Sequence, residues 1–135
     1  SIAAGLGDVA IVNTYYLGQM VEGKSFSDKA TAEYIGIVFP NQETTGTHIN
    51  ISGAGVVKYS KNKNNAIKLL EYLVSKDVQE KYASINFEYP VNKKAKLSKL
   101  LSSWGSFKED MSSLEKIGSF NTEAVKTFQK VRWDR

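Results

Sequence analysis

Residues 8–18 read Asp-Val-Ala-Ile-Val-Asn-Thr-Tyr-Tyr-Leu-Gly, and this stretch says most about the fold. Its first part, Asp8–Val12, is a short apolar run of the length expected for a buried strand. Asn13 or Thr14 can then cap a helix that begins with Tyr15 and Tyr16. The stretch therefore predicts a strand followed directly by a helix, with two adjacent tyrosines at the junction.

The remaining sequence alternates in the same way between apolar runs and helical patterns. Ile35–Phe39 predicts a second buried strand, and residues 47–58 are extended in character around a glycine-bearing stretch. Helices are predicted over 27–33, from Asn62 or Asn64 to about Val74, over 76–85, near Leu97 and Met111, and from Asn121 onward. Strands that alternate with helices and short loops predict an α/β protein.

The first residues favour a longer parent chain. Ser1–Gly7 resembles the last turn of a helix that ends at glycine, and neither an initiator Met nor a signal peptide precedes it. We therefore expect the chain to be a piece of a longer protein, with a signal peptide in the upstream sequence.

Composition excludes several kinds of site. The chain has 135 residues, a formal net charge of +4 and no cysteine, which removes disulfides, zinc–thiolate sites and thiol nucleophiles. No apolar run approaches the roughly 18 residues that span a bilayer, so the chain is not expected to cross a membrane. The lysines are scattered rather than clustered with aromatic residues, which favours a solvated surface over a nucleic-acid interface.

The adjacent tyrosines carry the clearest chemistry. Two phenolates supply negatively charged oxygen donors of the kind that a hard metal cation prefers. Side chains of neighbouring residues in a regular helix diverge by about 100°, but an irregular strand-to-helix junction lets both converge. Taken alone, such a pair is more often a packing feature than a metal site.

Three stretches together resemble the iron-binding subunits of bacterial ferric-iron ABC transporters, particularly the cyanobacterial and marine type. They are residues 8–18, residues 47–73, which begin Thr-His-Ile-Asn-Ile-Ser-Gly-Ala-Gly, and Glu88–Val91 with residues 103–110 after it. The resemblance covers nearly all of this chain, but only about the last two-fifths of a family member.

This resemblance implies a type II periplasmic-binding-protein-like fold whose two lobes close over one ferric ion. Residues 1–46 would belong to the C-terminal lobe, residues 47–91 would supply a hinge strand and part of the N-terminal lobe, and residues 92–135 would return to the first lobe. Tyr15 and Tyr16 would be iron ligands, with the other ligands upstream. Asn13 matches, more weakly, a position that holds an anion near the iron.

The resemblance also implies a periplasmic solute-binding protein, not an enzyme, that delivers Fe(III) to a membrane ABC permease. An anion or a water would complete the iron shell. The alternative within the same fold is a protein that binds a small anion or an organic solute. His48, the only histidine, lies outside the ligand motif and is expected to be a surface or hinge residue. No nucleophile elbow or phosphate-binding glycine motif supports hydrolytic or nucleotide chemistry.

Overall fold

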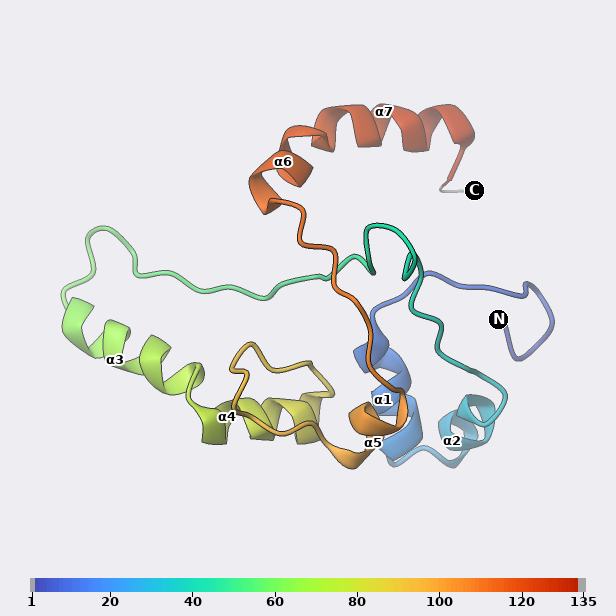
Figure 1. The fold of residues 1–135 in the computed structure, drawn as a ribbon, viewed down its shortest axis with the longest axis horizontal. Helices are drawn as coiled ribbons and strands as arrows, with labels where there is room; N and C mark the ends of the chain where they lie inside the picture. The colour runs from blue at the N-terminus through green and yellow to red at the C-terminus, as the bar shows by residue number, and fades with distance from the viewer. Residues whose placement is uncertain (1, 134–135) are drawn as a thin grey trace. The chain divides into compact units, whose positions relative to one another are not determined.

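The computed structural model describes residues 2–133, which divide into two compact units (Figure 1). The first unit contains the chain up to Val38 together with Asn50–Ser106. The second contains Phe39–Ile49 and the residues from Phe107 onward. The chain therefore passes from one unit to the other after Val38, Ile49 and Ser106.

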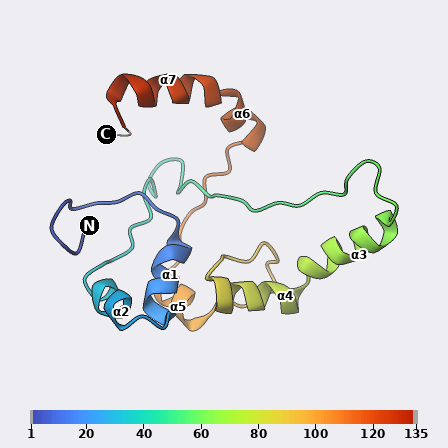
Figure 2. The ribbon, with the colours of Figure 1, turned by 180° about the vertical axis from the view of Figure 1, so that it is seen from behind.

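The first unit is built from helices around a small apolar core. Its elements are α1 (Thr14–Glu22), α2 (Phe26–Ala32), α3 (Lys63–Leu73), α4 (Lys76–Lys81), the π-helix η1 (Tyr82–Asn86) and α5 (Lys99–Ser103). Ala83, Phe87 and Leu101 form the buried core, so that η1 and α5 meet there. Helix α1 lies beside α2 and α5 in both opposite views (Figures 1 and 2). This core is what holds the start of α1 in place.

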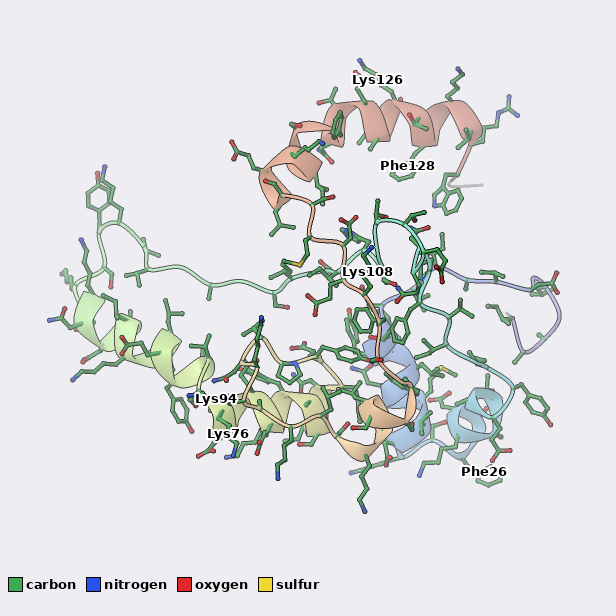
Figure 3. The ribbon with its side chains drawn as sticks, viewed as in Figure 1. Phe26, Lys76, Lys94, Lys108, Lys126 and Phe128 are labelled. Carbon is green, nitrogen blue, oxygen red and sulfur yellow. The ribbon has the colours of Figure 1, made fainter. Side chains whose placement is uncertain are left out.

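The described part of the second unit, up to residue 133, contains two helices and a tightly hydrogen-bonded loop. Its helices are α6 (Leu114–Ser119) and α7 (Asn121–Val131). Phe39 stacks on Phe107, with ring centroids 4.3 Å apart and an interplanar angle of 15°. Lys108, from the chain pass after Ser106, lies against the loop of residues 41–46 and donates from Nζ to the Thr44 carbonyl (Figure 3). The two separate segments of this unit are thus joined to each other.

The predicted helices are confirmed with small shifts. Helix α2 begins at Phe26, earlier than expected, because the Ser25 hydroxyl rather than Ser27 caps it by accepting from the Asp28 amide at 3.2 Å. The helix predicted over 76–85 is α4 continued by η1, so its last turn has π geometry. The helices expected near Leu97 and Met111 begin at Lys99 and Leu114, each after a capping serine.

The predicted strands are wrong as paired strands. Among residues 2–133 the only β-bridge is an isolated parallel one between Thr47 and Glu109. Residues 8–12 and 35–39 belong to no strand, and Val9 and Val38 are 84% and 85% exposed. An apolar run predicts that a segment can be extended and buried, but a strand also needs a neighbouring backbone to pair with, and no described residue supplies one for these two segments.

Two more findings bear on the earlier expectations. Residues 2–5 form a hydrogen-bonded turn with Gly5 at φ 72°, which fits the predicted glycine stop, while Ser1 lies outside the described residues. None of the helices within residues 2–133 combines the length and apolar character needed to cross a bilayer.

Candidate metal centre

The tyrosine pair lies in the first turn of α1, where the sequence predicts it. Asn13 precedes the helix with an extended backbone (φ −72°, ψ 139°), which is typical of a helix-capping position. Its side chain makes no capping hydrogen bond. Instead, Nδ2 of Asn13 donates to Oη of Tyr15 at 3.4 Å, so the amide holds the phenol and leaves the first helical N–H groups uncapped by a side chain.

The two tyrosines are close to each other but differ in surroundings. Their ring centroids are 4.4 Å apart with an interplanar angle of 42°. The ring of Tyr15 is partly buried and packs against the core of Ala83, Phe87 and Leu101. Tyr16 is 51% exposed. One phenol is therefore anchored by the core, whereas the other faces solvent beside it.

The side chain of Tyr15 affects the ionisation of Tyr16. The hydrogen bond between the side chains of Tyr15 and Tyr16, followed by repulsion between the two groups when charged, raises the pKa of Tyr16 above its usual value of 10.0. Tyr16 therefore remains a neutral phenol at neutral pH when no cation is present. A cation that binds both oxygens must displace protons, and its charge would remove the repulsion that opposes ionisation.

The start of α1 favours negative charge nearby. The first turn contains no acidic residue, and the amides at a helix start carry partial positive charge. Phenolate oxygens or a small anion close to this turn would be stabilised by that field. The predicted strand before the pair is absent, so the junction is an extended segment leading into a helix.

Other conventional metal ligands are not gathered in the described chain. Residues 2–133 contain no group of three or more His, Cys, Asp or Glu side chains that could hold a metal ion. His48 is exposed and lies in the second unit, whereas the tyrosine pair lies in the first. Its charge contributes, after two hydrogen bonds from Ser112, to the lowered pKa of Asp110. The structure thus brings Asn13, Tyr15 and Tyr16 together within the first unit, and His48 belongs to the second unit.

The close contact between Gly18 and Phe87, next to the tyrosine pair, was not predicted from the sequence. A Cβ atom placed on Gly18 would lie 2.4 Å from Cγ of Phe87, so α1 approaches this ring as closely as a glycine allows. Gly18 follows Tyr15 by three residues and therefore shares its helix face. That spacing was visible in the sequence, but the partner ring comes from a segment distant in the chain.

A family model described as bacterial extracellular solute-binding protein matches residues 4–109. The chain belongs to this family. Iron uptake protein A1 of Synechocystis sp. is 42% identical over 133 residues, which are 98% of this chain and 37% of that protein. The major ferric iron-binding protein of Neisseria meningitidis is 33% identical over 85 residues, covering 63% of this chain and 24% of that one.

Solved structures of family members match the fold. A Trichodesmium protein (IdiA, FutA) in complex with iron and citrate ligands gives a TM-score of 0.92 at 43% identity, over 98% of this chain and 42% of that one. A ferric binding protein from Campylobacter jejuni gives 0.88 at 38% identity, over 96% and 41%. These matches confirm the predicted α/β, periplasmic-binding-protein-like class. The chain spans about two-fifths of the length of these relatives.

Proposed function

We propose that the protein is a periplasmic solute-binding protein that captures ferric iron with the phenolates of Tyr15 and Tyr16. The observation that carries the proposal is the tyrosine pair itself. Two phenols with ring centroids 4.4 Å apart stand at an uncapped helix start, one of them held by Asn13 and the core. A hard trivalent cation is the ligand that such a pair of oxygen donors suits best.

The identity of the relatives supports the same cargo. The Synechocystis relative is named as an iron uptake protein, and the Trichodesmium relative was solved with iron and citrate ligands. We infer that a carboxylate anion such as citrate, or a water, completes the iron shell near Asn13 and the start of α1. Two phenolates do not fill the shell of a ferric ion, so further protein ligands would come from chain outside residues 2–133.

We also propose the rest of the transport role. Residues 1–46 and 92–135 would belong to one lobe and residues 47–91 to a hinge and the other lobe, so the packing of Tyr15 on Ala83 and Phe87 would be a contact between the two lobes. The loaded form would deliver iron to an ABC permease without catalysis. A protein for a small anion or organic solute in the same fold is the second candidate. The citrate in the Trichodesmium complex is the observation that favours it.

The test compares the protein expressed from its complete gene with its Tyr15→Phe and Tyr16→Phe variants. Each change removes one anionic ligand but keeps the ring, so we expect ferric affinity to fall by about 3 kcal/mol, roughly a hundred-fold in Kd. Competition with a chelator measures the affinity, and the visible phenolate-to-iron charge-transfer band should fade or shift. Tyr34→Phe, in an exposed tyrosine outside the pair, is the control. Unchanged ferric affinity in both pair variants would refute the ferric site, and citrate binding that iron does not strengthen would favour the second candidate.

A further inference from the structure

Phe87 has a backbone conformation that is rare for a bulky residue. It ends η1 in the left-handed region, at φ 60° and ψ 34°, and its amide closes the π-turn onto the carbonyl of Tyr82. Glycine or asparagine usually fills such a position because a Cβ atom is strained there. A strained residue persists only where its surroundings hold it, and such residues concentrate near functional sites.

The strained backbone conformation places the Phe87 ring in the core of the first unit. The side chain is 7% exposed and lies in the core with Ala83 and Leu101. A glycine at this position would remove the strain but would leave that volume empty. The ring is therefore the reason to keep a phenylalanine here.

The Phe87 ring meets α1 at Gly18. A Cβ atom on Gly18 would lie 2.4 Å from Cγ and 2.5 Å from Cβ of Phe87, distances at which one of the two elements must move. Gly18 is also buried, inside a helix where glycine is unfavourable on its own account. Its place in α1 is thus explained by the close approach of η1.

The contact between Gly18 and Phe87 is close to the tyrosine pair along α1. Tyr15 is on the same face of α1 as Gly18, one turn earlier, and its ring packs on the same core that contains Phe87. Tyr16 is then placed by its ring contact with Tyr15, at 4.4 Å between centroids. A displacement of α1 from η1 would therefore move Tyr15 first and Tyr16 with it.

We propose that the Gly18–Phe87 contact is a positioning device that sets the direction in which Tyr15 and Tyr16 present their hydroxyls to the cargo ion. The proposal deepens the proposed function and rests on it. In this proposal Gly18 and Phe87 do not bind the ion themselves. They act through the rings of Tyr15 and Tyr16. Gly18 closes the stretch 8–18 from which the tyrosines were predicted, whereas Phe87 lies far from it in the sequence.

The test uses the protein expressed from its complete gene with three variants: Gly18→Ala, Phe87→Leu and the two combined. We expect Gly18→Ala to weaken ferric binding at least about tenfold and to shift the charge-transfer band, because the added methyl displaces α1. Phe87→Leu should shift the band in its own right. The combined variant should lose less affinity than the sum of the two single losses, because both act through one contact.

The matched control is Gly118→Ala. Gly118 also lies inside a helix, α6, but a Cβ atom there meets nothing within 4 Å, so affinity and band should stay as in the unchanged protein. Thermal melting of the iron-free variants separates positioning from stability. Lower melting temperatures with unchanged band and Kd, or strictly additive losses, would overturn the proposal. If Gly18→Ala does not fold, Phe87→Leu alone decides. An unchanged protein that shows no ferric band would instead overturn the proposed function.

Discussion

Tyr15 and Tyr16 are adjacent in the sequence, yet the fold gives them different surroundings. Tyr15 accepts a hydrogen bond from Asn13 and packs on the core, whereas Tyr16 is half exposed. Under the proposed function, a rigid oxygen donor next to a more accessible one would suit capture of an ion from solvent. The more accessible oxygen would meet the ion first, and the anchored one would fix its final position. The difference in exposure between Tyr15 and Tyr16 follows from their places in the first turn of α1, because neighbouring residues of a helix point in directions about 100° apart.

A third tyrosine, Tyr89, packs on the core that anchors Tyr15, and its burial makes the stability of the protein depend on pH. Burial raises the pKa of Tyr89, which packs beside Ala83, Phe87 and Leu101. Below the ordinary tyrosine pKa of 10.0 the phenol is neutral in both the folded and the unfolded chain. Above it the unfolded chain ionises first, so the folded state loses stability as pH rises toward the raised pKa.

We therefore expect the melting temperature of the iron-free protein to fall as the pH rises through 10.0 toward the raised pKa of Tyr89, and to fall less steeply in Tyr89→Phe. Tyr59→Phe, at an exposed tyrosine of the same unit, should leave the slope unchanged and serves as the control. The prediction is wrong if Tyr89→Phe and the unchanged protein lose stability with the same slope.

At the scale of elements, a glutamine joins the two segments of the second unit. Nε2 of Gln42 donates to the Pro40 carbonyl, the Thr47 hydroxyl and the Lys108 carbonyl at 3.1, 2.9 and 3.2 Å. Its Oε1 accepts from the Lys108 amide at 2.7 Å. The parallel bridge between Thr47 and Glu109 lies next to this network. Gln42 thus ties the chain pass before Ile49 to the one after Ser106.

We expect Gln42→Leu to destabilise the second unit by about 2 kcal/mol, because several backbone groups lose a partner worth roughly 1 kcal/mol each. Gln129→Leu is the matched control, since Gln129 is an exposed glutamine on α7 and its change should stay within about 0.5 kcal/mol. Denaturant unfolding of both variants measures the difference. Equal stability of the two variants would show that the network contributes nothing.

The elements also show how far sequence reasoning extends. Helices α1, α3 and α7 were predicted because candidate capping residues and 3.6-residue periodicity are local signals. The structure shows no side-chain cap on any of the three, and Asn121, the expected cap of the last helix, is the first residue of α7. Residues 8–12 and 35–39 were predicted as strands, and this was wrong because pairing depends on a second backbone that a local pattern does not contain. The tyrosine pair was predicted from its motif, and it stays a prediction as a ligand pair. The Gly18–Phe87 contact joins positions distant in the sequence, which no local pattern could reveal.

At the scale of the whole molecule, much apolar surface of the described chain lies open. Val9, Ile11 and Val38 are all more than four-fifths exposed, and the apolar face of α7 exposes Val125 and Phe128 by 45% and 51%. Figure 3 shows the side chain of Phe128 on α7. Soluble proteins seldom expose so many large apolar side chains together. The family members that the chain matches are more than twice its length, and their additional chain is the natural candidate to cover these faces.

The proposed function requires both phenolates to bind one ferric ion, and an experimental structure of the iron-loaded protein, expressed from its complete gene, would show whether they do. We expect one iron bonded to Oη of Tyr15 and Oη of Tyr16, with the remaining positions filled by donors outside residues 2–133 and by an anion or water. The Tyr15 ring should still lie on the core with Phe87. An iron bound elsewhere, or the two hydroxyls directed away from it in the loaded protein, would show that the tyrosines are not a ligand pair.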